Sequence, residues 1–267
     1  MISPAVALPQ LNASKKFWIT LGVIVWLYFV ISNLPAIWGA YALTRSGDLA
    51  MSGVSGTLWT GRASLVSVKI KGADHSLGQL TWKLQILSLF TLKPCALITT
   101  QMDNQQFDGT VCFKGKTGIT VRNANASFPA VLVQPLLPLA IDGQLGLVLE
   151  KLEIENSQLL AIRGKASWMN VKIYNGSNWM SLGGVGADLV DDGKKGLTAH
   201  IMDINSPVHL DLVATLPFPT GGSVKGGLSL PEPYFRELNA SAWLSMFAVP
   251  QANDAQGNLV YLVDLNF

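Results

Sequence analysis

Residues 145–154 read LGLVLEKLEI, and their apolar side chains alternate with polar or small ones. The first three leucines, beginning with Leu145, fall on one side of an extended chain, because successive side chains of a strand point to opposite faces. Leu152 and Ile154 continue the spacing one position out of step, as they would beyond a β-bulge. The stretch therefore predicts a long strand with one apolar face and one bulge.

The same alternation recurs outward from this stretch, and no long segment after Tyr41 repeats apolar residues at helical spacing. Residues 66–70, 208–212 and 259–265 each carry apolar side chains at every second position. Turn dipeptides separate such runs: Asp142-Gly143, Asn175-Gly176, Asp192-Gly193, Gly221-Gly222 and Gln256-Gly257. We predict a mainly β fold in which roughly a dozen antiparallel strands follow one another.

Two segments break this pattern. Residues 84–92 form a short apolar run that Lys93-Pro94 ends, and residues 128–140 contain three prolines. Proline removes a backbone donor, so neither a regular strand nor a long helix fits the second segment. We expect both to be short helical turns that cover the core at an end of the sheet. Contact with a membrane is the alternative for each.

The N-terminal part is apolar without alternation. Residues 17–38 read FWITLGVIVWLYFVISNLPAIW and carry no charge. A helix of this length spans about 30 Å, the thickness of the hydrocarbon core of a bilayer. We therefore predict a single transmembrane anchor. A cleaved signal peptide, cut after Ala40-Tyr41-Ala42, is the main alternative, and a buried core helix is the other.

The residues around this segment predict its orientation. Lys15 and Lys16 precede it and favour a cytoplasmic N-terminus, while Trp18 at one end and Trp38 with Tyr41 at the other suit the two membrane interfaces. The predicted divisions are a cytoplasmic tail (residues 1–16), the anchor (17–38) and an exported β domain (39–267), with two related halves (39–125 and 126–267) as a further option.

The composition narrows the class of protein. Of the 267 residues, 49% are hydrophobic and 13% charged, against about 25% charged in ordinary soluble domains. The net charge of +2 lies in the two lysines before the anchor. Disordered and nucleic-acid-binding proteins need a charge excess that is missing here. The β domain has apolar surface to cover, either by packing two sheets in a sandwich or by leaving a concave apolar face for a ligand or partner.

Cys95 and Cys112 are the only cysteines, and they lie eight residues on either side of Asp103-Asn104. A hairpin that turns there places them opposite each other, and the far side of a bacterial inner membrane is oxidising. We expect a structural disulfide, with two free buried thiols as the alternative.

We find no motif for catalysis. His75, His200 and His209 are scattered without metal-ligand spacing. Gly53-Val54-Ser55-Gly56 departs from the nucleophile elbow of serine hydrolases. We therefore predict neither enzymatic activity nor a metal or cofactor.

A set of short motifs resembles protein N of the bacterial type II secretion system. They are Asn33-Leu34-Pro35-Ala36 at the end of the anchor, then Gly56, Leu58, Trp59 and Gly61, then Leu77, Gly78 and Trp82, and later residues 164–168. The resemblance covers residues from about 15 to 267, and the Gly-x-Leu-Trp-x-Gly block is its most specific part.

The resemblance implies an inner-membrane component of the machine that exports folded periplasmic proteins across the outer membrane. It implies a single span, the bulk of the chain in the periplasm, and contacts with other secretion subunits. No catalytic residue carries over. The sheet of the family resembles that of AsmA-like proteins, and a lipid-binding or lipid-transfer role for an apolar β groove is the alternative function.

Overall fold

The computed structural model describes residues 15–45, 47–70, 73–91, 93–115, 117–136, 140–156, 158–174, 178–193, 196–217, 221–245 and 247–266. Most of the predicted cytoplasmic tail, residues 1–14, therefore lies outside the described residues.

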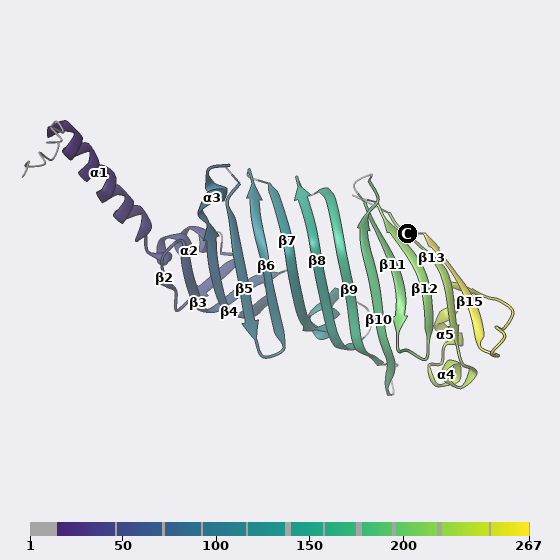
Figure 1. Cartoon of the computed structure of the whole chain (residues 1–267). Coiled ribbons are helices and arrows are strands. Elements are labelled where there is room, and N and C mark those ends of the chain that lie inside the picture. Colours follow the sequence, from purple (N-terminus) through teal and green to yellow (C-terminus); the bar gives the residue numbers. More distant parts are fainter. Residues whose placement is uncertain are drawn as a thin grey trace, which may run out of the picture.

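The described chain forms one 15-stranded antiparallel sheet, which confirms the mainly β prediction (Figure 1). The strands are β1 (Leu49–Ser52), β2 (Ser55–Gly56), β3 (Thr60–Ile70), β4 (Ala73–Gln85), β5 (Cys95–Met102), β6 (Gln105–Lys114), β7 (Gly118–Pro129), β8 (Ile141–Glu155), β9 (Gln158–Tyr174), β10 (Trp179–Asp191), β11 (Leu197–Ile204), β12 (His209–Leu216), β13 (Ser223–Leu230), β14 (Ala248–Pro250) and β15 (Leu259–Asn266). From β3 to β13 each strand pairs with its neighbours in the sequence, and β15 then lies between β13 and β14. A single sheet replaces the sandwich alternative. The suggested boundary between halves, near residue 125, falls inside β7.

The register gives the sheet two unlike faces. One row of directly paired residues crosses β3 to β15 and is almost wholly apolar; we call it the apolar row. It consists of Ala63, Leu80, Thr100, Phe107, Ala126, Leu147, Ala166, Ala187, Ile201, Leu212, Gly226 and Val263. The next row, on the opposite face, is mostly polar: Arg62, Thr81, Thr99, Asp108, Asn125, Val148, Lys165, Asp188, His200, Val213, Lys225 and Asp264. Because paired side chains share a face, the alternation in the sequence becomes one apolar and one polar surface.

The predicted bulge in β8 is confirmed. Leu149 pairs with Gly164 of β9 while Lys151 pairs with Arg163, so Glu150 is the extra residue. The predicted turn at Asp142-Gly143 is wrong, because these residues lie inside β8 at a second irregularity of the pairing, where Gly143 has a φ of 125°. Glycine supplies a positive φ to bulges as readily as to turns. Asp192-Gly193, Gly221-Gly222 and Gln256-Gly257 lie between strands, as predicted, and Asn175-Gly176 lies outside the described residues.

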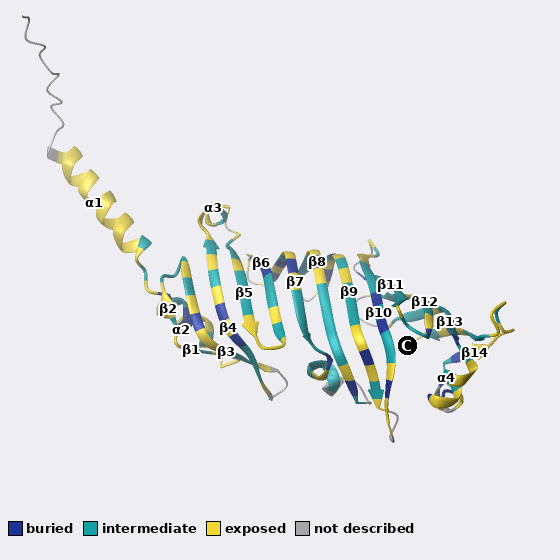
Figure 2. Cartoon of the chain, turned by 60° about the horizontal axis from the view of Figure 1, so that its bottom comes forward, coloured by how far each residue is buried: buried dark blue, intermediate teal, exposed yellow. Residues whose placement is uncertain are grey.

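The N-terminal apolar segment forms two helices where one was expected. Helix α1 (Lys15–Ser32) ends six residues before the predicted limit, and α2 (Ala36–Thr44) begins after Pro35. Proline disfavours helical geometry in the residue before it, which ends α1. Within the described residues, no helix has both the length and the apolar character needed to cross a membrane. Helix α1 projects beyond the sheet and is exposed along its length (Figure 2).

Short helices cover the other end of the sheet. Helices α4 (Glu232–Glu237) and α5 (Ser241–Leu244) precede β14 and pack on the apolar face of β13 and β15. Leu230 and Leu244, both fully buried, are at the centre of this core. The apolar face is therefore closed at the C-terminal end of the sheet, and its N-terminal end is covered differently.

Candidate functional site

An apolar groove lies on the apolar face at the N-terminal end of the sheet. Strands β3 to β7 form its floor, while α2 and the 3-10 helix η1 (Ala130–Leu136) supply lining residues above it. The groove encloses a cavity of about 1020 Å3, at the upper end of the volumes of small-molecule sites. A smaller cavity of about 560 Å3 opens on the polar face between β2 and β5.

The floor is made of the apolar row and the residues beside it. Leu80 pairs with Thr100, which pairs with Phe107, which pairs with Ala126, so four strands present a continuous surface. A parallel row runs through Leu84, Ala96 and Val111. Their exposed neighbours, such as Thr81, point to the polar face. The groove is thus the concave apolar face that the composition left open as an alternative to a sandwich.

Helix α2 covers the groove through small residues. Ala36 and Ala40 are buried against the sheet, and a Cβ on Gly39 would lie 2.6 Å from Cδ1 of Leu58. The sequence-based prediction assigned residues 36–38 to the membrane anchor and residues 39–44 to the β domain, so it did not include a helix over residues 36–44 that covers the groove. The signal for it is the spacing of Ala36, Gly39 and Ala40, which places three small residues on one helical face.

The two irregular segments behave differently. For residues 128–140, the expected cover is confirmed over the described part: Ala130 is fully buried, and Leu132 and Val133 of η1 line the groove. For residues 84–92 the expected cover is wrong. They contain helix α3 (Ile86–Leu89), in which no residue is buried, and Phe90 beside it is 83% exposed.

The glycine–tryptophan block forms the joint between α1, α2 and the sheet. The Trp59 indole N–H donates to the carbonyl oxygen of Ile31 at 2.7 Å, at the end of α1. The Trp82 indole donates to Leu58 at 3.1 Å, and the Leu58 amide donates to Leu34 at 2.8 Å. The motif residues that sequence reasoning singled out therefore hold the turn between the two helices.

Glycine is required on both sides of this joint. Gly61 lies under the ring of Trp82, where a side-chain carbon would overlap the indole. Gly56, its cross-strand partner, has a φ of 95° in the β2–β3 turn. Gly78 has a φ of 73° at the irregularity in the β3–β4 pairing, and Leu77 before it lines the groove. The motif therefore shapes the groove wall as well as the joint.

The predicted aromatic side chains near the membrane interfaces are all exposed. Trp18 lies in the first turn of α1, and Trp38 and Tyr41 lie on α2, where they are 70% and 73% exposed. Trp38 and Tyr41 lie on the side of α2 opposite to Ala36 and Ala40, whose side is buried. Lys15 and Lys16 are the first two residues of α1, and Lys16 is exposed.

The predicted disulfide is confirmed. Asp103-Asn104 forms the turn between β5 and β6, and Cys95 pairs directly with Cys112 at a Cα–Cα distance of 4.0 Å. The bridge lies at the ends of both strands, next to α3. The Cys95 amide donates to Oγ of Ser88 in α3 at 2.8 Å, so the bridge and the helix form one unit.

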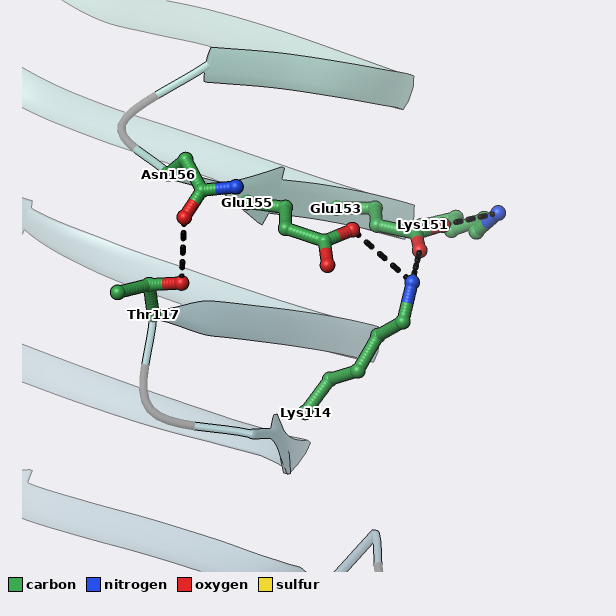
Figure 3. A network of polar contacts seen from close by, with 6 residues as sticks. All are labelled: Lys114, Thr117, Lys151, Glu153, Glu155 and Asn156. Carbon is green, nitrogen blue, oxygen red and sulfur yellow. Dashed lines mark hydrogen bonds and ion pairs between the residues drawn. The ribbon is translucent and has the colours of Figure 1, made fainter.

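The densest cluster of charged side chains lies at the same edge of the sheet (Figure 3). Lys114 contacts Glu155 at 2.9 Å and Glu153 at 3.9 Å, and Lys151 contacts Glu153 at 2.8 Å. The hydrogen bond from Lys151 lowers the pKa of Glu153, and the hydrogen bond to Glu155 raises the pKa of Lys114. Both shifts favour the charged forms, so this is an ion-pair network that ties β6 to β8 across β7.

The histidines are separate in space as in sequence. His200 contacts Asp211 at 2.8 Å and His209 contacts Asp203 at 3.4 Å, both between β11 and β12. His75 lines the groove far from both. Over the residues that the structure describes, no three metal-ligating side chains gather at one point.

Comparison with known proteins gives one match. The sequence profile described as "Type II secretion system (T2SS), protein N" matches residues 48–256, which include the glycine–tryptophan block, the floor of the groove, the disulfide and most of the sheet, whereas α1 and α2 precede the matched range. No curated protein and no solved structure matches the chain significantly.

Proposed function

The chain belongs to the type II secretion system protein N family, and from this premise we propose that it is a non-enzymatic inner-membrane component of the secretion apparatus. It supports the export of folded periplasmic proteins across the outer membrane by contacts with other inner-membrane or periplasmic subunits. The observation that carries the proposal is the family match over most of the β domain.

The proposed membrane attachment is a single span with a cytoplasmic N-terminus and the β domain in the periplasm. In its support, α1 exposes large apolar side chains on all sides, from Phe17 to Ile31. Its 18 residues correspond to about 27 Å of helix, somewhat short of the roughly 30 Å hydrocarbon core of a bilayer, so α1 by itself would cross most of that core. An isolated helix that is apolar all round needs an apolar environment.

The proposed subunit contacts have a suitable surface at the last strands. Strand β14 covers only three residues of β15, and no described strand pairs with the outer side of β15 from Asp264 to Asn266. Unpaired backbone groups at a sheet edge accept an added strand from another chain. Val249 and Leu262, which are exposed nearby, supply apolar contact area.

A deletion strain tests the secretion role. Loss of the chain should stop or reduce export of the substrates of the apparatus, and the full chain should restore it. A photo-crosslinking residue at Leu262 should capture another subunit, whereas the same residue at Val148, on the polar face of the middle of the sheet, should not. Normal export without the chain would overturn the proposal, as would equal capture at both positions.

Lipid binding or transfer is the second candidate function, and the apolar groove favours it. A cavity of about 1020 Å3 with a nearly continuous apolar lining has room for acyl chains, and each methylene moved from water to such a site gains about 0.8 kcal/mol. The polar lining atoms come from a few side chains, among them Thr100, Gln105 and Gln106.

Crosslinking in the intact membrane separates this function from the first. A benzophenone side chain at Phe107, on the groove floor, should yield a lipid adduct, and one at Asn125, on the opposite face of the next strand, should not. Ala126→Phe should reduce the adduct by narrowing the floor, while Asn125→Phe should leave it unchanged. Groove and surface positions that label equally would exclude a lipid site.

A further inference from the structure

The α3 segment is the most exposed apolar surface of the β domain. Ile86, Leu87, Leu89 and Phe90 are 56%, 81%, 37% and 83% exposed. They lie next to one another in one helical turn between β4 and β5 (Figure 2). Contiguous exposed apolar side chains mark a surface that something else covers.

The backbone presents these side chains rigidly. Ser88 Oγ donates to the carbonyl of Gln85 at 2.5 Å and accepts from the Cys95 amide at 2.8 Å, and Thr91 Oγ1 donates to the carbonyl of Ser88 at 2.8 Å. The disulfide from Cys95 to Cys112 fixes the strand ends below. These bonds engage the hydroxyl groups of Ser88 and Thr91, and the exposed side chains of Ile86, Leu87, Leu89 and Phe90 give the turn an apolar outer surface.

The charged residues nearest to α3 in the sequence are of one sign. Lys83 and Lys93 flank the turn and are both exposed, and they are the only charged residues between Asp74 and Asp103. An apolar tip between lysines, without a carboxylate in that stretch, matches a bilayer surface that contains anionic phospholipid. At the same edge of the sheet, the carboxylates of Glu153 and Glu155 are paired with Lys114 and Lys151.

The position of α3 agrees with this occupant. Helix α1 leaves the N-terminal end of the sheet and rises toward the long edge that carries α3, and both views show this (Figures 1 and 2). Helix α2 comes between α1 and α3 in the sequence, and its aromatic side chains, Trp38 and Tyr41, are exposed. Three apolar surfaces thus occupy the same end of the molecule.

We propose that α3 is a second membrane contact, in which Leu87 and Phe90 insert into the surface of a bilayer and Lys83 and Lys93 bind anionic headgroups. The proposal builds on the membrane attachment proposed above for α1. It gives the sheet a fixed tilt over the bilayer. It also sets the groove near the lipid, because two residues that line the groove are close to α3 in the chain or through a hydrogen bond: Leu84 lies two residues before α3, and the Phe113 amide donates to the carbonyl oxygen of Pro94 in the segment after it.

The test uses the full chain in vesicles of phosphatidylethanolamine and phosphatidylglycerol. A single environment-sensitive fluorophore is attached at Leu87→Cys, at Val249→Cys or at Trp26→Cys. The label at position 87 should shift to shorter wavelength and be quenched by spin-labelled lipid, whereas the label at 249, equally apolar but at the other end of the sheet, should do neither. Lys83→Gln with Lys93→Gln should weaken insertion by about fivefold per lysine at low salt.

The outcomes are distinct. A label at 87 that stays in water while the label at 26 is quenched would overturn the α3 proposal and leave the anchor standing. A label at 26 that stays in water would overturn the anchor. Insertion at 87 that is indifferent to both lysines and to phosphatidylglycerol would overturn the assigned headgroup contact.

Discussion

Removal of the Cys95–Cys112 bridge should loosen one hairpin of the sheet and leave the rest intact. The bridge closes a sequence separation of 17 residues, which corresponds to about 3 kcal/mol on the chain-entropy model. Each strand contacts mainly its neighbours, so the sheet resembles a linear array whose members open separately. The bridge therefore restricts the open state of β5, β6 and the attached α3 more than that of distant strands.

Hydrogen exchange of the native full chain measures this effect directly. In Cys95→Ala/Cys112→Ala, amides of β5 and β6 should exchange on the order of 100-fold faster, the equivalent of about 3 kcal/mol, while peptides from β11 and β12 serve as an internal reference. The matched control is Leu97→Ala/Thr110→Ala, a cross-strand pair two positions along the same hairpin, which should cost only about 0.2–1 kcal/mol. The reasoning fails if both variants behave alike, or if β11 and β12 respond as strongly as β5 and β6.

Three further changes test the joint and the ion-pair network. Trp59→Phe removes the hydrogen bond to Ile31 and should release the end of α1 by about 1 kcal/mol, seen as roughly fivefold faster proteolysis between α1 and β1; unchanged cleavage would contradict this. Gly61→Ala should lower stability to urea by about 1–3 kcal/mol through overlap with the indole ring of Trp82, whereas Gly227→Ala, a strand glycine with open space around it, should change it little; equal effects would refute the packing argument. The pKa of Glu153 is lowered, so its contribution to stability is present above the ordinary glutamate pKa and is lost as the pH falls through the folded-state value. Glu153→Gln should therefore flatten the loss of stability below about pH 4.5. An unchanged acid profile would argue against a stabilising role for the Glu153 ion pairs.

The strands and the disulfide were predictable because each depends on local spacing. Alternation places apolar side chains on one face whatever the partner strand, and two cysteines equidistant from Asp103-Asn104 meet in any regular hairpin. The end of α1 was misplaced because hydropathy is blind to backbone geometry, although Pro35 carried the signal. Asp142-Gly143 was misread because a positive φ serves a bulge as well as a turn.

The sequence predicted the groove only as one of two alternatives, because the apolar residues of the β domain fit either a two-sheet sandwich or a single sheet with an open apolar face. Its floor depends on register: Phe107 meets Ala126 across strands only after the irregularity between Asp108 and Thr110 shifts the pairing. Its cover depends on α2 folding back onto β1 to β3, which the apolarity of residues 36–44 did not distinguish from a membrane span. The exposure of α3 could not be predicted from the sequence either, because a short apolar run has the same composition whether its side chains are buried in a core or exposed on the surface.

The pairing of strands in chain order also has a consequence for how the protein comes into being. A chain is made from its N-terminus and domains begin to fold during synthesis, and here every strand from β4 to β13 finds its partner already complete just upstream. The sheet can therefore lengthen one strand at a time without waiting for distant sequence, a condition that favours rapid folding. Only the closing step departs from this order, because β14 must wait for β15 to arrive before it has a neighbour. Strand β15 thus supplies the partner of both β13 and β14, and a nascent chain stopped before residue 259 would leave β13 and β14 without it.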